Sequence, residues 1–389
     1  MAGAGGRARR SPATAAAHRC DLPRIVIAAG GTAGHVVPAL AVADVLSERG
    51  AEVEFIGGER AEAELVPAAG YPLHRLRVTG MDRGNALRAA RALLLAARAT
   101  TQARGLLKRL GADAVMGGGG YVAGPVGLAA RSLRLPLVLT EADSHLGVAN
   151  RLLAPLAQRV FLAFPIEGRS GAKWVVAGRP VPAATGRVDR AAARERFGLA
   201  PDEPCVLVFG GSLGARRLNH AALDAFGTAA PGVVLHASGQ RDHPELRERL
   251  DELGSPHHYH LYPYVLPFAE LLAASDLVVA RAGGSVMEVA AAGRPAILVP
   301  YPHATADHQT LNARYMERAG AAVVVPDAEL DGPRLAREAG SLLGAPQRMA
   351  AMTKAARAVA KPEAARRIAD ELLALAGGGS ALGTGGKRS

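Results

Sequence analysis

The sequence predicts an α/β protein built from two Rossmann-like domains that face each other across a cleft. Short apolar, β-branched runs alternate with Ala-rich helical segments along most of the 389 residues, which is typical of a parallel, doubly wound sheet. This length is enough to bury two hydrophobic cores. The design of RIVIAAGGTAGH (24–35) recurs in CVLVFGGSLGAR (205–216), as an apolar strand, a Gly-Gly turn and the start of a helix.

The strand candidates place the first domain at residues 24–178. They are RIVIAAG, EVEFIGG, PLHRLRV, DAVMGG, LPLVLTE, RVFLAF and WVVAG, in chain order. A Pro-rich linker follows at 179–188, and then the second domain at 189–345. Residues 346–376 are predicted to be helical. Their pattern leaves open whether the last helix crosses back to the first domain. Residues 1–23 and 377–389 carry no apolar periodicity and are predicted to be flexible tails.

Composition excludes several classes of protein. The net charge is +11, and subtracting the four Arg of the first twenty residues and the two basic residues of the last fourteen leaves about +5, too little to indicate a nucleic-acid partner. Two cysteines form no disulfide framework and no metal-type spacing, which favours a reducing cytoplasm. No uncharged apolar stretch reaches the roughly 18 residues of a membrane span. The Arg-rich, acid-poor start is also typical of an organellar transit peptide.

A nucleotide site is predicted where strand 277–280 ends at Gly283-Gly284-Ser285 and a small-residue helix begins. Free N–H groups at a helix start bind anions, and glycines let a phosphate approach the backbone. Glu288, one turn further, suits the two hydroxyls of a ribose. The alternative interpretation is a plain helix cap with a solvated acid.

A polar cluster follows the next strand, 296–300. Its members are His303, Asp307, His308 and Gln309. Because parallel strands end at the same sheet edge, the cluster is expected beside the nucleotide turn, where it can bind a sugar. The alternative is a polar surface loop.

His35 is the first candidate for a general base. It follows the turn GGTAGH at a helix start, where the positive end of the helix dipole lowers an imidazole pKa and keeps the ring neutral. Neither Gly-Gly turn has the G-x-G-x-x-G spacing of a dinucleotide site, which argues against a dehydrogenase. The alternative role of His35 is to cap its own loop.

Two more segments of the first domain suggest binding. The run GGGGYVAGP (117–125) has too many glycines for one tight turn, and we expect it to line a second ligand. The predicted helix 86–110 carries six Lys or Arg and no acid, with leucines between them. Such a helix can lie on an anionic membrane surface. A helix packed on a sheet with a solvated Arg face would look the same.

These motifs, together with TEADSHLGVANR (140–151) and the order in which they occur, resemble the MurG family, the bacterial N-acetylglucosaminyltransferases of peptidoglycan synthesis. The resemblance runs from about residue 24 to 367. It implies a GT-B fold and transfer of GlcNAc from UDP-GlcNAc to the muramoyl 4-hydroxyl of the undecaprenyl-diphosphate-linked intermediate, lipid I, with inversion. It implies a peripheral enzyme on the cytoplasmic membrane face, with no cofactor and no obligatory metal. The sequence has no Asp-x-Asp pair that would hold a divalent ion.

The resemblance also assigns site residues. Ser285, Glu288 and Ser212 would meet the diphosphate and ribose, Val265 would read uracil through its backbone, and His308 and Gln309 would contact the GlcNAc hydroxyls. The donor sugar and acceptor would meet His35. The remaining residues expected to bind substrate are Thr32, Ala33, Gly34, Gly119, Gly120, Tyr121, Asp143, Arg179 and Gly284.

Three departures from the family pattern affect recognition of the sugar and acceptor. The usual HEQN is Thr140-Glu141-Ala142-Asp143, the usual GNPVR is Gly178-Arg179-Pro180-Val181-Pro182, and the first of two paired glutamines is His308. Because Asp143 and Glu141 are acids beside the expected site, they are the substitute bases if His35 has another role.

Other functions share parts of this pattern. A UDP-GlcNAc 2-epimerase would use the same fold and donor without a lipid acceptor. A galactolipid synthase is favoured only if residues 1–23 are a transit peptide. A non-catalytic sugar-nucleotide sensor would not need His35, Glu288 and Gln309 together.

Overall fold

The computed structural model describes residues 22–78, 86–211 and 214–378. The first domain is a seven-stranded parallel sheet in the order β3-β2-β1-β4-β5-β6-β7. Its strands are β1 Arg24–Ala28, β2 Glu52–Gly57, β3 Leu73–Arg75, β4 Ala114–Gly117, β5 Leu137–Glu141, β6 Arg159–Leu162 and β7 Trp174–Val176. Its helices are α1 Ala33–Glu48, α2 Ala61–Ala68, α3 Ala86–Leu110, α4 Ala123–Ser132 and α5 Val148–Leu153, followed by the 3₁₀ turn η1 Ala154–Leu156. A strand lies within each of the seven predicted segments.

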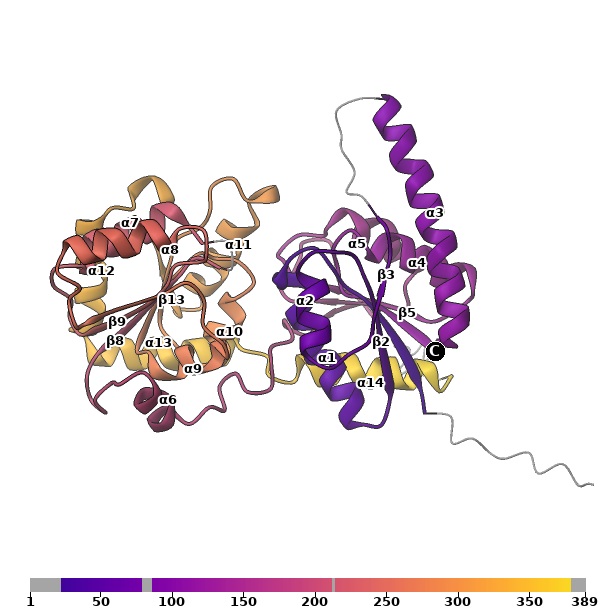
Figure 1. Cartoon of the computed structure of the whole chain (residues 1–389). Coiled ribbons are helices and arrows are strands. Elements are labelled where there is room, and N and C mark those ends of the chain that lie inside the picture. Colours follow the sequence, from indigo (N-terminus) through magenta and orange to yellow (C-terminus); the bar gives the residue numbers. More distant parts are fainter. Residues whose placement is uncertain (1–21, 79–85, 212–213, 379–389) are drawn as a thin grey trace, which may run out of the picture.

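The second domain is a six-stranded parallel sheet in the order β10-β9-β8-β11-β12-β13 (Figure 1). Its strands are β8 Cys205–Phe209, β9 Val233–Ala237, β10 Tyr259–Tyr262, β11 Leu277–Ala280, β12 Ala296–Leu298 and β13 Ala322–Val324. Its helices are α6 Arg190–Arg196, α7 Arg216–Phe226, α8 His243–Glu252, α9 Phe268–Ala274, α10 Val286–Ala291, α11 His308–Arg318, α12 Gly332–Leu343 and α13 Pro346–Val359, with 3₁₀ turns η2 Thr305–Asp307 and η3 Asp327–Glu329. The sequence pattern had not singled out β9, β10 and β13.

Both sheets repeat one arrangement. The first strand of each, β1 or β8, lies between the second strand and the later strand β4 or β11. The chain order therefore reverses beside β1 and beside β8. Open α/β sheets bind ligands at such a reversal, outside the carboxyl ends of the strands. Both Gly-Gly turns lie at these positions, because each follows β1 or β8 directly.

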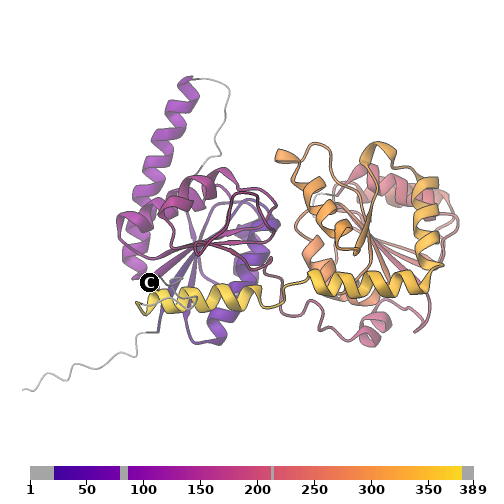
Figure 2. The ribbon, with the colours of Figure 1, turned by 180° about the vertical axis from the view of Figure 1, so that it is seen from behind.

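The last helix, α14 (Ala364–Ala376), packs on the first domain (Figure 2). Its Ile368 and Leu372 are buried in the core beside α1, and Asp370 forms an ion pair with Arg49. The preceding α13 packs against α10 and α12 of the second domain. Two chain segments therefore connect the domains, the linker before α6 and the link between α13 and α14.

The basic helix α3 packs on α4 through the part nearest its C-terminus. Ala99, Ala103, Leu106 and Leu107 are buried there, whereas Arg98 is exposed. The opposite end of α3 extends beyond the body of the domain (Figure 1). In the described part of the chain, no helix is both long and apolar enough to cross a bilayer.

Candidate active site

The first Gly-Gly turn connects β1 to α1 and places His35 at the start of the helix. Gly31 has a φ of +108°, which a residue with a side chain rarely adopts. Thr32 precedes α1 with extended backbone and an exposed side chain, and its Oγ1 lies 3.3 Å from His35 Nδ1. Ala33 and Gly34 complete the first turn of the helix. The contact with Thr32 involves the Nδ1 side of the imidazole.

The second glycine run packs directly against the first turn. A Cβ on Gly119 would lie 2.6 Å from His35 Cδ2, and one on Gly120 would lie 1.9 Å from the Gly30 carbonyl oxygen. Only glycine fits at either position. Tyr121 follows, and its hydroxyl donates to Glu62, 2.9 Å away. The two runs, far apart in sequence, thus form one wall around His35.

Glu62, at the start of α2, was not predicted from the sequence. Its carboxylate accepts hydrogen bonds from the backbone N–H groups of Gly31 and Gly58, at 2.8 and 2.9 Å. The available signal was weak, because an acid in the first turn of a helix is common. Only the fold brings it under the glycine turn.

The pKa of His35 is lowered from its usual value, and the first cause is burial rather than the helix terminus. Asp143 and Glu62 act in the opposite direction, while Arg179 and His308 lower the pKa further. The pKa is lowered, as predicted, and burial is the largest of the causes found. The imidazole is neutral near pH 7 and able to accept a proton.

The loop after β5 places the two substitute bases in different environments. Glu141 is buried and accepts from the backbone N–H groups of Asp143 and Gly147 and from Asn150 Nδ2, at 3.3, 2.8 and 2.9 Å. Burial raises the pKa of Glu141, against these donors. Its oxygens therefore serve to shape the loop. Asp143 is half-buried and close enough to influence His35 electrostatically.

Arg179 connects both loops that carry the candidate bases. Its guanidinium donates to the carbonyl oxygens of Gly34 and Ala142, at 2.5 and 3.1 Å, and the residue is only 5% exposed. These carbonyls belong to the residues immediately before His35 and Asp143. Burial lowers the pKa of Arg179, while the carboxylates of Asp143, Glu288 and Glu141 raise it.

The nucleotide turn of the second domain lies against the same arginine. A Cβ on Gly284 would lie 2.2 Å from Arg179 Cζ. Ser285 precedes α10, and its side chain makes no capping hydrogen bond. Glu288 is half-buried in the first turn of α10, and burial raises its pKa while Arg179 lowers it. The predicted phosphate and ribose residues thus lie beside the loops of the first domain.

The sugar-binding candidates also lie at the contact between domains. The rings of His145 and His308 stack with centroids 5.7 Å apart, and Ser144 Oγ donates to the His308 carbonyl oxygen at 3.3 Å. Gln309 Oε1 accepts from the Tyr301 N–H at 2.9 Å, which holds its side chain to the loop before η2. These contacts bring the start of α11 to the loop that holds Asp143.

Of the remaining two predicted residues, the structure describes Val265 but not Ser212. Val265 is buried in the loop between β10 and α9, next to the exposed Tyr264. Ser212 lies outside the described residues. In the described part of the chain, no group of His, Cys, Asp and Glu side chains is arranged to hold a metal ion.

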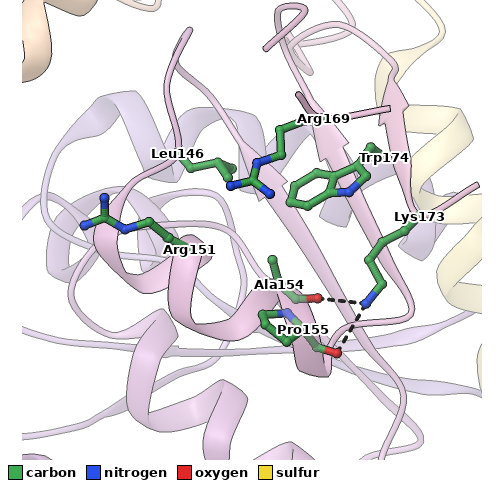
Figure 3. A pocket seen from close by; sticks show the side chains of 7 residues that line it. All are labelled: Leu146, Arg151, Ala154, Pro155, Arg169, Lys173 and Trp174. Carbon is green, nitrogen blue, oxygen red and sulfur yellow. Dashed lines mark hydrogen bonds between the residues drawn. The ribbon is translucent and has the colours of Figure 1, made fainter. Parts of the chain in front are cut away.

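A separate surface cavity beside α5 and β7 contains none of the predicted site residues (Figure 3). Its lining includes Arg151, Arg169, Lys173 and Trp174. Lys173 donates to the carbonyl oxygens of Ala154 and Pro155, and Arg169 lies over the Trp174 ring at 5.0 Å. Two of its three cations therefore already have partners, and we place the candidate active site at the glycine turns instead.

Comparisons with known proteins agree with this arrangement. Family models match residues 25–162, as the N-terminal domain of glycosyltransferase family 28, and residues 205–371, as its C-terminal domain. The UDP-N-acetylglucosamine–N-acetylmuramyl-(pentapeptide) pyrophosphoryl-undecaprenol N-acetylglucosamine transferase of Stutzerimonas stutzeri is 43% identical, over 91% of this chain and 99% of its own. The protein of the same name from Alkalilimnicola ehrlichii is 45% identical, over 89% and 97%.

Solved structures separate this family from others with the same fold. The crystal structure of Acinetobacter baumannii MurG has a TM-score of 0.72 at 32% identity, covering 90% of this chain and 99% of that one. A UDP-GlcNAc 2-epimerase from Neisseria meningitidis has a TM-score of 0.61 at 14% identity, covering 89% and 98%, which is a likeness of fold alone. The predicted two-domain GT-B fold is confirmed, and the chain belongs to the MurG family of N-acetylglucosamine transferases within glycosyltransferase family 28.

Proposed function

We propose that this protein transfers GlcNAc from UDP-GlcNAc to the muramoyl 4-hydroxyl of lipid I, with inversion at the anomeric carbon. The observation that carries the proposal is the 43% identity, over 99% of its length, to a transferase whose name states this donor sugar and this acceptor. The meeting of His35, Arg179 and Gly284 from both domains supports it, because a transfer needs base, counter-charge and donor site together.

The donor is proposed to bind the second domain. Its diphosphate would lie at the N–H groups of Gly284 and Ser285 and at Ser212, and its ribose at Glu288. The backbone of Val265 would read the uracil. His308 and Gln309 would contact the GlcNAc hydroxyls, since both lie at the start of α11 and His308 contacts the loop of Asp143.

The chemical step needs a proton acceptor and a counter-charge for the leaving diphosphate. Neutral His35 would take the proton of the acceptor hydroxyl as that oxygen attacks the anomeric carbon. The negative charge that develops on the leaving UDP would be met by backbone N–H groups and by Arg179, whose guanidinium lies against Gly284. Asp143 remains the first substitute base. Glu141 is the second, because its carboxylate oxygens already accept three hydrogen bonds.

The acceptor is proposed to bind the first domain. Thr32, Ala33 and Gly34 would lie on one side of the muramoyl group, and Gly119, Gly120 and Tyr121 on the other. Since the acceptor carries an undecaprenyl chain, the enzyme would work as a peripheral protein on the cytoplasmic face of the membrane. The basic helix α3 would contact the anionic surface.

The membrane role of α3 has a direct test. Replacing Arg88, Arg91 and Arg98 by Gln is expected to weaken binding to anionic vesicles by ~3 kcal/mol, about 1 kcal/mol per basic residue near the surface. Activity on a soluble acceptor is expected to be unchanged. Co-sedimentation with vesicles that contain an anionic phospholipid measures the effect.

A matched control removes three charges from the second domain. Arg318, Arg337 and Arg348 are exposed there, outside the proposed membrane surface. The same change to Gln at these positions is expected to leave vesicle binding near that of the wild type. If both triple variants bind the anionic vesicles equally well, the arginines of α3 form a solvated face and do not contact the membrane.

A radiolabelled transfer assay tests the function as a whole. UDP-GlcNAc and UDP-galactose are each supplied with and without a lipid I analogue. Labelled lipid product is expected only from UDP-GlcNAc with the analogue. Conversion of UDP-GlcNAc without acceptor would indicate an epimerase, galactose transfer would indicate a galactolipid synthase, and binding without turnover would indicate a sensor.

A further inference from the structure

We propose that Glu62 is a positioning residue for the transfer reaction, which holds three glycine-containing segments in place around His35. This inference rests on the proposed role of His35 as the base. No family motif named above includes Glu62. Its side chain is fully buried, at 0% exposure.

The carboxylate of Glu62 is surrounded by donors. Oε2 accepts from the Gly31 N–H at 2.8 Å, and Oε1 accepts from the Gly58 N–H and the Tyr121 hydroxyl, each at 2.9 Å. Within the described residues, no Lys or Arg forms an ion pair with it. Burial raises the pKa of Glu62, but the donors outweigh burial and the net shift is downward, so the group is ionised.

The three donors belong to three segments, two of which contact each other beside the imidazole. Gly31 belongs to the first glycine turn, and Tyr121 follows the glycines that contact His35 and the Gly30 carbonyl. The third segment is Gly57-Gly58, where Gly57 also packs closely against Leu73. A Cβ on Gly57 would lie 2.8 Å from Glu62 Cγ, and one on Gly58 would lie 1.9 Å from the Tyr121 hydroxyl. This pair of glycines therefore makes room for the carboxylate and its phenol partner.

The second domain has a buried carboxylate at the equivalent place. Glu62 lies at the start of the helix after β2, and Asp242 lies at the start of the helix after β9. Asp242 is also fully buried, and it accepts from Asn219 Nδ2 at 3.0 Å. A Cβ on Gly214 of the second Gly-Gly turn would lie 3.0 Å from Asp242 Oδ2. A buried carboxylate therefore lies beside the glycine turn after the first strand of each domain, but Asp242 also accepts from Arg241, whereas Glu62 accepts from the turn itself.

An amide cannot replace the Glu62 carboxylate without loss. Both oxygens accept, so the NH₂ group of a Gln would face a donor whichever way the amide turned. At least one of the three segments would lose its partner and shift. Displacing His35 or the wall opposite it would misplace the base relative to the acceptor hydroxyl, while the donor site in the other domain would be unaffected.

Glu62→Gln is therefore expected to lower turnover by about tenfold, with UDP affinity near that of the wild type. The acid limb of its pH–rate profile should move to lower pH, because the charge of Glu62 raises the pKa of His35 and the variant lacks it. Glu62→Asp keeps the charge, so its acid limb should stay in place while turnover falls less. The control is Glu48→Gln, which changes an exposed carboxylate of α1.

Several measurements keep the test decisive. Thermal unfolding and UDP binding show whether each variant is folded. If Glu62→Gln does not fold, Glu62→Asp and Tyr121→Phe carry the test, and their effects on turnover should be less than additive in the double variant. A folded Glu62→Gln with wild-type turnover and an unmoved acid limb would overturn the inference. Retained turnover in His35→Ala would instead overturn the base assignment.

Discussion

Replacing His35 by Ala is expected to lower turnover by about 10²- to 10⁴-fold while UDP still binds with nearly wild-type affinity. The proton moves only in the transition state, so its acceptor contributes little to binding of the donor in the ground state. His35 belongs to the first domain, whereas the proposed nucleotide site belongs to the second. Single-turnover transfer to a lipid I analogue, with UDP titration of the same sample, measures both quantities.

The wild-type enzyme should also lose turnover in acid. A base works only in its neutral form, so the rate falls as pH falls through the pKa of His35. Burial lowers that pKa from 6.5, which places the acid limb below the pH at which an exposed histidine titrates. The limb should be lost from the residual activity of His35→Ala.

His257→Ala is the matched control, since it removes an exposed histidine of the second domain. It is expected to retain wild-type turnover and pH profile. If His35→Ala keeps most of its turnover, His35 is a loop-capping residue, a role that is consistent with its contact with Thr32. The test then passes to Asp143 before Glu141, because the Glu141 oxygens already hold the loop. Loss of UDP binding would place His35 in the donor pocket.

Most of the predicted strands could be found because they are short apolar runs, several of which are followed closely by glycine or proline. β9, β10 and β13 were harder, since VVLHA and YHLY contain histidine and AVV is only three residues long. The docking of α14 could not be predicted. The apolar face of a helix that carries Ile368 and Leu372 would suit either domain, and only the packing against α1 decides.

The glycine turns could be predicted because runs of glycine stand out in the sequence, and the same runs make them functional candidates. A run of glycines in a sequence marks a place where a side chain would collide with something. The sequence does not say with what. The contacts of Gly119 with His35 and of Gly284 with Arg179 join segments far apart in the chain. The role of Glu62 and the burial that lowers the His35 pKa depend on the same kind of contact, so neither could be predicted from local pattern.

Glu288→Ala is expected to raise the dissociation constant of UDP about 10- to 100-fold, which corresponds to roughly 1.5 to 3 kcal/mol for charge-assisted hydrogen bonds to the ribose. The fold should survive, because the side chain is only half-buried at the contact between domains. Isothermal titration with UDP measures the change. Glu248→Ala, which removes an exposed carboxylate of α8, is the control and should bind like the wild type.

Arg179 is expected to reduce the loss of UDP affinity in Glu288→Ala. Its charge lies close enough to affect Glu288, so loss of the carboxylate leaves the site more positive and favours the diphosphate. Uridine has no phosphate and should therefore lose more affinity than UDP. A ligand without ribose hydroxyls separates the two contributions: 2′,3′-dideoxy-UDP should bind more weakly than UDP to the wild type, yet equally to Glu288→Ala. If both enzymes discriminate between the two ligands to the same extent, the hydroxyls are recognised elsewhere and Glu288 has no ribose role.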